Sequence, residues 1–503
     1  MEAETYDSMT NISTGRVRKQ ALCRASAICD ADWFRALMAY DIKVDSRDLD
    51  GYHGNTLLHF AADLSKARSS LDQLVSGVGI NTKNEFGLMP LHLAVASGDT
   101  QLVGSLLELG ADINAPDIQQ ATPLHWAAKE GRMECLKLLL QHQAEVDARD
   151  VSKETPLHWA ARRGNVECTN LLLQAGACVN ITNTYSATPL DGALFSGKVQ
   201  CVRLLLRAGA KVNVGKEYEL KPLHIAAELG HDECVKNLLL AGSHVNALDK
   251  EKKTALYRAV RNGHLSCVRM LLEAGAIADN TDNMYAETPL FAAIDSGNVE
   301  CMKLLIQFGA SVNALDGKGG TPLHRATRQG SVECCKLLLA SGAQDIADIR
   351  GDTPVTLAVR LNNSHLLKLF VTWNFDVNVT SVSLHLQPLS VALSSVQEQN
   401  HRITSHRLEM ADMLLTAGAR TRVLHELLSH PYPTLDSHSR EQLTEWITSR
   451  RGRIFSLFHL SRLVIRDVLR SNPQPFHMFH RSVQNLPLPA IVQKAITDIF
   501  PVC

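Results

Sequence analysis

Two short sequence motifs, called words below, decide the fold of this chain: Thr-Pro-Leu-His-Trp-Ala-Ala at Thr122–Ala128 and Leu-Leu-Leu at Leu138–Leu140. Both words return at Thr155–Ala161 and Leu171–Leu173. Looser copies of the first word occur through most of the chain, and successive copies start 32 to 34 residues apart. The copies begin at Thr56, Met89, Thr122, Thr155, Thr188, Lys221, Thr254, Thr288, Thr321, Thr353 and Gln387. Self-similarity at this period indicates stacked structural repeats rather than several globular domains.

The unit that starts at Thr155 shows why each repeat folds. Thr155 is a favourable N-cap, and Pro156 takes the first helical position, where a missing amide hydrogen costs nothing. A short first helix follows, and Gly164 ends it because glycine adopts positive φ without strain. The apolar run at Leu171–Leu173 belongs to a second helix that ends at Gly176. One helix pair cannot bury its apolar face alone, so we expect each pair to stack on its neighbours.

This unit resembles the ankyrin repeat, whose signature is a 33-residue period with Thr-Pro-Leu-His-x-Ala. The resemblance implies an all-α solenoid of about 12 helix-pair repeats with β-turn fingers, over residues 16–423. A degenerate first unit begins at Gln20, as expected for a terminal repeat with one face in water. Residues 1–15 are polar, and we expect them to be disordered. The last unit has extra residues around Ser394–His406, which form either a surface loop or a contact with a substrate or another domain.

Composition is ordinary for a soluble protein: 503 residues, 45% hydrophobic, 20% charged and a formal net charge of −1. No excess of basic charge points to nucleic acid or to a membrane surface. No apolar run is long enough to cross a membrane, and the N-terminus lacks the apolar core of a signal peptide. We therefore expect a cytoplasmic protein that could also enter the nucleus.

Seven cysteines recur at one repeat position, near the start of the second helix: Cys135, Cys168, Cys201, Cys234, Cys267, Cys301 and Cys334. One interpretation is a ladder of metal ligands or disulfides, and the other is a small side chain packed between helices. Neighbouring helices pack about 8–10 Å apart, whereas a disulfide needs Cα atoms within about 7 Å. The spacing favours the packing interpretation.

A second pattern lies near the end of the chain, after a linker and short helix at residues 424–451. Three residues at a spacing of four follow a capping serine and share one helical face, so the set is Ser456, Leu457, Ser461 and Ile465. A proline-rich gap, the sequence Leu486-Pro487-Leu488-Pro489 and an amphipathic helix come next. A plain helical cap on the solenoid is the structural alternative.

Residues 452–503 resemble a SOCS box, and the whole chain is similar to the ankyrin repeat and SOCS box family. In that family the first motif binds elongin C of the elongin B–elongin C heterodimer, which assigns that role here to Ser456, Leu457, Ser461 and Ile465. The second motif selects cullin-5, which assigns Leu486, Pro487, Leu488 and Pro489. The resemblance implies a substrate-recognition adaptor of a cullin-5–RING ubiquitin ligase that binds an unknown protein substrate. The alternative function is an ankyrin scaffold that joins protein partners without ubiquitin.

The sequence contains no motif that supports catalysis or a cofactor. It has no Gly-rich phosphate loop, no His-Glu-x-x-His and no paired Cys-x-x-Cys. The pair His477 and His480 lacks further nearby ligands, so a zinc site is not expected. Histidines at the fourth position of the repeated word are interpreted as a hydrogen-bonding framework: His59, His92, His125, His158, His224 and His324.

The variable positions near the ends of the first helices are candidates for contact with a substrate. They include a set of cations, Lys129, Arg162, Arg163, Arg258, Arg261, Arg325 and Arg328. One hypothesis is that an acidic segment of a target binds there, and the alternative is ordinary solvated charge, since Glu130, Glu228 and Asp295 interleave. Trp126 and Trp159 share one repeat position and are either core residues or exposed aromatic anchors.

Overall fold

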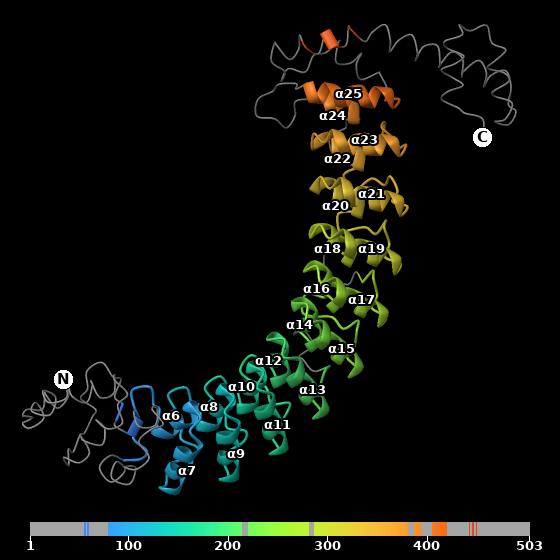
Figure 1. Ribbon diagram of the computed structural model, residues 1–503. Coiled ribbons are helices and arrows are strands. Elements are labelled where there is room, and N and C mark those ends of the chain that lie inside the picture. The colour runs from blue at the N-terminus through green and yellow to red at the C-terminus, as the bar shows by residue number, and fades with distance from the viewer. Residues whose placement is uncertain are drawn as a thin grey trace, which may run out of the picture. The chain divides into compact units, whose positions relative to one another are not determined.

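The computed structural model describes residues 55–56, 58–59, 79–213, 220–280, 286–380, 387–393, 405–419, 442, 445–446 and 449. These residues form helices and turns, with no strand among them. The chain divides into two compact units, Met1–Asn283 and Met284–Cys503. In each unit the described residues make a row of helix pairs, which confirms the predicted all-α solenoid (Figure 1).

In the first unit, six pairs follow one another, each with a first helix of seven or eight residues and a second helix of nine. They are α6 Pro90–Ser97 and α7 Thr100–Glu108, α8 Pro123–Glu130 and α9 Met133–Gln141, α10 Pro156–Arg163 and α11 Val166–Gln174, α12 Pro189–Phe195 and α13 Val199–Arg207, α14 Pro222–Leu229 and α15 Asp232–Leu240, and α16 Ala255–Arg261 and α17 Leu265–Glu273. Each first helix contacts its own second helix, and from α6 to α14 each first helix also contacts the first helix of the next pair. The apolar faces therefore form one continuous core along the row.

The second unit repeats this arrangement with four pairs in its described part. They are α18 Pro289–Asp295 and α19 Val299–Gln307, α20 Pro322–Gln329 and α21 Val332–Ala340, α22 Pro354–Arg360 and α23 Ser364–Thr372, and α24 Pro388–Leu393 and α25 Ser405–Thr416. Most of the extra residues of the last pair, 394–404, lie outside the described residues.

The helix ends agree with the residues that predicted them. Thr155 has extended backbone dihedrals, φ −100° and ψ 166°, and α10 begins at the next residue, Pro156. Gly164 follows the last residue of α10 with φ 83°, in the left-handed region that only glycine adopts without strain. Gly176, after α11, has φ 87°. Thr155 and Gly164 thus flank α10 at its two ends, and Gly176 lies in the turn that follows α11.

Each of the six repeated histidines links its own repeat to the next one. In His125 the Nδ1 atom accepts a hydrogen bond from the backbone N–H of Thr122 at 3.1 Å. The opposite ring atom, Nε2, lies 3.1 Å from the carbonyl oxygen of Glu154 in the following repeat and donates to it. Equivalent Nε2 contacts join the other five histidines to a carbonyl of the next repeat. The framework interpretation is confirmed.

Burial keeps these imidazoles neutral. It lowers the pKa of all six histidines, and that of His125 to about 4. The hydrogen bond to Glu154 and the charges of Asp117 and Glu154 act in the opposite direction on His125 and are outweighed. A proton on Nδ1 would also displace the backbone N–H that Nδ1 accepts. In His125 the hydrogen bond that Nδ1 accepts at the start of its own helix therefore needs the neutral ring.

The seven repeated cysteines are buried in the second helices, as the packing interpretation predicted. Burial raises the pKa of the Cys135, Cys234 and Cys301 thiols to about 11 and that of Cys168 to about 12. These thiols are therefore protonated and unreactive at neutral pH.

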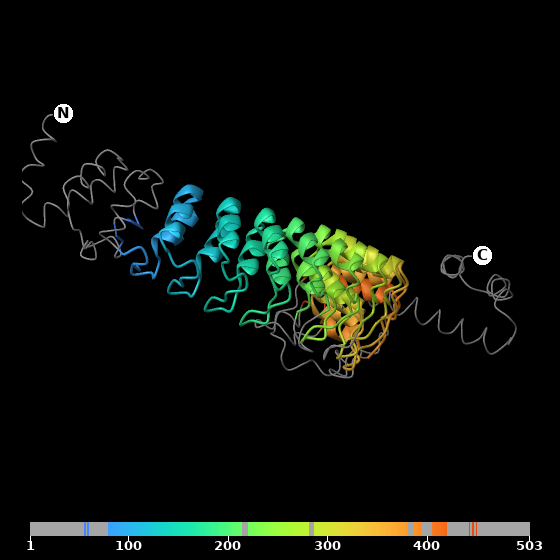
Figure 2. The ribbon, with the colours of Figure 1, turned by 90° about the horizontal axis from the view of Figure 1, so that it is seen from below.

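The segments between pairs form the predicted β-turn fingers. In the finger of α8, the N–H of Gln120 donates to the carbonyl of Asp117 at 3.0 Å, and the side chain of Asp117 accepts from the N–H groups of Gln119 and Ala121. Neighbouring tips are linked directly, since the N–H of Val151 donates to the carbonyl of Gln119 at 2.8 Å. Figure 2 shows the fingers of the first unit projecting to one side of its helices.

Several predictions lie outside the described residues. They concern the N-terminal segment 1–15, the degenerate unit from Gln20, most of the linker 424–451 and the whole of the box at 452–503. Within the linker, residues 442, 445–446 and 449 are helical, at positions where the sequence predicts a short helix.

Candidate protein-binding surface

The predicted substrate-binding residues all lie on first helices. Trp126 and Lys129 belong to α8, and the other predicted residues lie on α10, α16 and α20. They fall at three repeat positions, which lie four, seven and eight residues after the start of the repeated word. The structure separates them into two groups, one in each unit.

Trp126 and Trp159 form a half-buried aromatic pair in adjacent repeats. Each indole Nε1–H donates to the Oδ2 atom of its finger aspartate at 3.1 Å, Trp126 to Asp117 and Trp159 to Asp150. The ammonium of Lys129 lies 4.4 Å from the ring centre of Trp126 and 5.8 Å from that of Trp159. Both rings are thus partly packed and fixed in orientation, while part of each remains accessible as an interface anchor would require.

Arg258 occupies the same repeat position in α16 and binds the same kind of partner. Its Nε and one terminal nitrogen donate to Oδ2 of Asp249 at 2.9 and 2.5 Å. The carboxylate of Glu251 lies 3.4 Å from that same terminal nitrogen, and the carboxylate of Glu228 lies 3.6 Å from the other one. Three carboxylates therefore surround this guanidinium, and its charge is compensated within the protein.

Arg325 repeats this arrangement in α20 of the second unit. Its terminal nitrogens lie 2.7 Å from Glu287, 3.2 Å from Asp295 and 3.9 Å from Asp316. The guanidinium carbon lies 5.5 Å from the ring centre of Phe291. The sequence identified Arg258 and Arg325 as basic positions, but it did not reveal the carboxylates that face them.

The remaining predicted cations differ in how far they are compensated. Arg162 pairs with Glu154 at 2.9 Å, and Arg328 lies 3.5 Å from Asp348. Arg163 and Arg261 are exposed and make no ion pair with a residue that the structure describes. These two arginines are the members of the predicted set best placed to meet a partner's acidic group.

A row of exposed apolar fingertips in the first unit escaped the sequence analysis. Phe86, Ile118, Val151 and Tyr185 occupy four successive fingers and are 46%, 55%, 57% and 83% exposed. The signal that could have found them is the apolar residue one or two places after the finger Asp or Asn in each of these repeats. Exposed apolar residues that line up in this way are typical of a protein-binding surface.

Neither the elongin-binding nor the cullin-binding residues fall within the described part of the chain. These are Ser456, Leu457, Ser461, Ile465, Leu486, Pro487, Leu488 and Pro489. The same holds for His477 and His480. Among the residues that are described, no group of three or more His, Cys, Asp or Glu is arranged to hold a metal ion. No helix in the described ranges combines the length and apolar character that crossing a membrane requires.

The comparison with protein families decides the classification. The family described as "Ankyrin repeats (3 copies)" matches residues 58–150, 148–216, 215–282, 276–347 and 308–381. The chain belongs to the ankyrin repeat family. Proteins of this family present their repeats to other proteins, so a protein partner is expected for this ankyrin repeat chain.

Individual relatives match over shorter stretches. The E3 ubiquitin-protein ligase KEG of Arabidopsis thaliana is 40% identical over 68 residues, which are 14% of this chain and 4% of that protein. The B-cell lymphoma 3 protein homolog of Mus musculus is 42% identical over 71 residues, 13% of this chain and 16% of that protein. The chain thus spans only a small part of these curated relatives. Among solved structures, the human ASB11 ankyrin repeat domain is 34% identical, with a TM-score of 0.42, over 45% of this chain and all of that one.

Proposed function

We propose that this chain is the substrate-recognition adaptor of an elongin B/C–cullin-5–RING ubiquitin ligase. The observation that carries the proposal is the order of two motifs behind an ankyrin array. Ser456, Leu457, Ser461 and Ile465 come first, and Leu486-Pro487-Leu488-Pro489 follows within the same terminal segment. Either motif alone is short enough to arise by chance, whereas both in this order match the resemblance to a SOCS box.

The spacing of the first motif gives it a physical basis. Leu457, Ser461 and Ile465 lie four residues apart and so would share one face of the helix that the sequence predicts there. The small Ser461 between two large apolar residues lets a partner helix approach closely, with Leu457 as the side chain that inserts. Leu486–Pro489 has two prolines, which favour a stiff extended backbone for the cullin contact.

The array would supply the substrate contact. In the first unit, the pair Trp126 and Trp159 with Lys129 combines partly accessible aromatic area with a positive charge. The apolar fingertips add exposed hydrophobic area, and Arg163 and Arg261 add cations without an ion pair to any described residue. A target with apolar side chains beside an acidic group would complement this surface.

In this proposal the chain carries out no bond making or breaking. Holding a target and the ligase together raises the local concentration of the target's lysines near the activated ubiquitin, and proximity of this kind accelerates transfer. The chemistry belongs to the RING subunit's conjugating enzyme. This division of roles agrees with the lack of a catalytic motif in the sequence.

The test is co-purification of the full chain with the elongin B–elongin C heterodimer. We expect the wild-type chain to retain the heterodimer and the double variant Leu457→Asp/Ser461→Phe to lose it. Ser461→Ala is the matched control, because alanine keeps the residue small and should leave binding intact. Circular dichroism of each variant checks that the array stays folded.

Two outcomes would count against the ligase role. If the wild-type chain retained no heterodimer, the ankyrin scaffold without ubiquitin would be the better account. If the double variant retained as much heterodimer as the wild type, any association would arise outside the proposed motif.

A further inference from the structure

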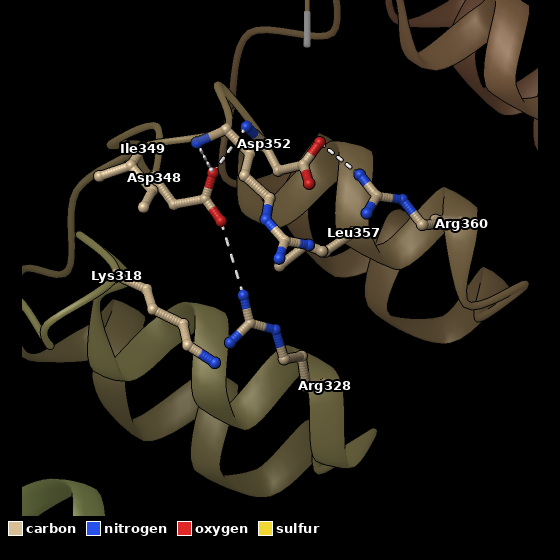
Figure 3. A pocket seen from close by; sticks show the side chains of 8 residues that line it. Lys318, Arg328, Asp348, Ile349, Asp352, Leu357 and Arg360 are labelled. Atoms are coloured by element: carbon tan, nitrogen blue, oxygen red, sulfur yellow. Dashed lines mark hydrogen bonds and ion pairs between the residues drawn. The ribbon is translucent and has the colours of Figure 1, made fainter. Parts of the chain in front are cut away.

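A pocket of about 310 Å³ in the second unit is lined mainly by charged side chains (Figure 3). Two successive fingers and the helices α20 and α22 contribute to it. The lining residues are Lys318, Arg328, Asp348, Ile349, Arg350, Asp352, Leu357 and Arg360. Arg328 was predicted as a basic surface residue, but the other seven were not singled out in the sequence.

The two carboxylates of the pocket are buried and already bound. Oδ1 of Asp348 accepts from the backbone N–H groups of Arg350 and Asp352 at 2.9 and 3.0 Å, and Oδ2 lies 3.5 Å from Arg328. Asp352 forms an ion pair with Arg360. The side chains of Asp348 and Asp352 are only 2% and 1% exposed. These carboxylates therefore hold the finger and two arginines in place and present little negative surface to a ligand.

The cations outnumber the carboxylates. Four cations, Lys318, Arg328, Arg350 and Arg360, stand against two carboxylates, which leaves a formal excess of two positive charges. Lys318 and Arg350 are exposed and make no ion pair with a described residue. The Nε–H of Arg360 is buried without a hydrogen-bond partner among the described groups. The pocket thus has unused charge and unused donors.

This charge balance selects the ligand. A phosphomonoester carries about −1.5 to −2 charges at neutral pH and several strong acceptor oxygens, so it can neutralise the excess. Arginine and lysine donors suit phosphate oxygens, and an arginine offers five N–H groups, of which one carboxylate uses only part. A single carboxylate would leave one positive charge uncompensated. Ile349 and Leu357 supply apolar wall for the methylene or methyl group that bears the phosphate.

We propose that this pocket binds a phosphorylated serine or threonine side chain of a protein partner. The inference rests on the proposed role of the repeats in substrate recognition, and it adds the chemical class of residue that the second unit recognises. Binding would make recruitment depend on prior phosphorylation of the target. Because the contact is electrostatic and close to solvent, it would weaken as ionic strength rises.

The experiment uses the full chain and three fluorescein-labelled Gly-Ser peptides that differ at one central residue. That residue is phosphoserine, glutamate or serine, and binding is followed by fluorescence anisotropy. We expect the phosphoserine peptide to bind about tenfold or more tightly than the other two. We also expect the double variant Lys318→Glu/Arg350→Glu to lose at least that factor for the phosphoserine peptide.

The matched control reverses two exposed lysines of α21 and α23 in the same unit, Lys336→Glu/Lys368→Glu, and so changes the net charge equally. It should bind the phosphoserine peptide within about twofold of the wild-type chain, since distant exposed charges are screened. Equal binding of the three peptides would overturn the proposal. So would an unaltered affinity in the Lys318→Glu/Arg350→Glu variant, or an equal loss in the control.

This assay contains no elongin and does not depend on residues 452–503. A failure here with intact elongin binding would remove the phosphate pocket and leave the ligase proposal standing. If elongin binding failed while the phosphoserine peptide bound, the ligase proposal would fall and the phosphate pocket would stand.

Discussion

His125 provides a test of how the repeats are held together. Its neutral ring accepts from Thr122 and donates to Glu154 of the next repeat, and burial lowers its pKa to about 4. In the unfolded chain its pKa returns to about 6.5. Because the folded pKa is the lower one, the stability that His125 contributes is complete above about pH 6.5. It is lost as the pH falls from there toward about 4.

The magnitude follows from that window. At this residue the unfolded state binds about half a proton more than the folded state at pH 6.5, and close to one proton more between about pH 5.5 and 5.0. At about 1.4 kcal/mol per pH unit, lowering the pH from 7.5 to 5.0 should remove about 2 kcal/mol of unfolding free energy through His125 alone. The other five repeated histidines also have lowered pKa values and add losses of the same sign.

The assay is urea unfolding of the wild-type chain and of His125→Asn, followed by circular dichroism at pH 7.5 and 5.0. The variant should be less stable at pH 7.5, but it should lose about 2 kcal/mol less than the wild type on acidification. His142→Asn is the control, since His142 is exposed and should leave the pH dependence unchanged. An identical acid loss in wild type and His125→Asn would refute the assigned role of the neutral ring.

Two further predictions concern single sites. Arg258→Ala should lower the free energy of unfolding by about 3 kcal/mol, because it leaves the buried carboxylate of Asp249 without its cation. Arg261→Ala, at an exposed position, should change the free energy of unfolding by less than about 0.5 kcal/mol in the same urea titration. A similar loss in both arginine variants would contradict the assigned ion cluster. In the folded protein at pH 8, iodoacetamide should modify the exposed Cys178 well before Cys168, because Cys168 is buried and its pKa is about 12. Mass spectrometry measures the modification at each cysteine. Equal modification of both would show that the helix pair opens readily.

Local chemistry made the fold predictable. Pro156 and Gly164 mark where the first helix begins and ends, and the regular period gives the order of the helix pairs in the described residues. The role of His125 also followed from its fixed place in each word. These features depend on residues close in sequence, so the pattern of one repeat contains them.

The candidate binding surface was less predictable, because the residues that contact its charged side chains come from distant segments of the sequence. Arg325 reads as a free cation in the sequence, yet Glu287 and Asp295, 38 and 30 residues earlier, meet it in space. The pocket around Lys318 and Arg350 likewise joins two fingers that lie a full repeat apart. Side-chain direction in neighbouring repeats decides such contacts, and the repeat period alone does not specify it.

The most direct test of the proposed function is the affinity of the full chain for purified elongin B–elongin C, measured by isothermal titration beside a version ending at residue 451. The proposal predicts a one-to-one complex with the full chain and no heat of binding with the shortened one. A full chain that does not bind the heterodimer, or a shortened chain that binds it equally well, would contradict the proposal.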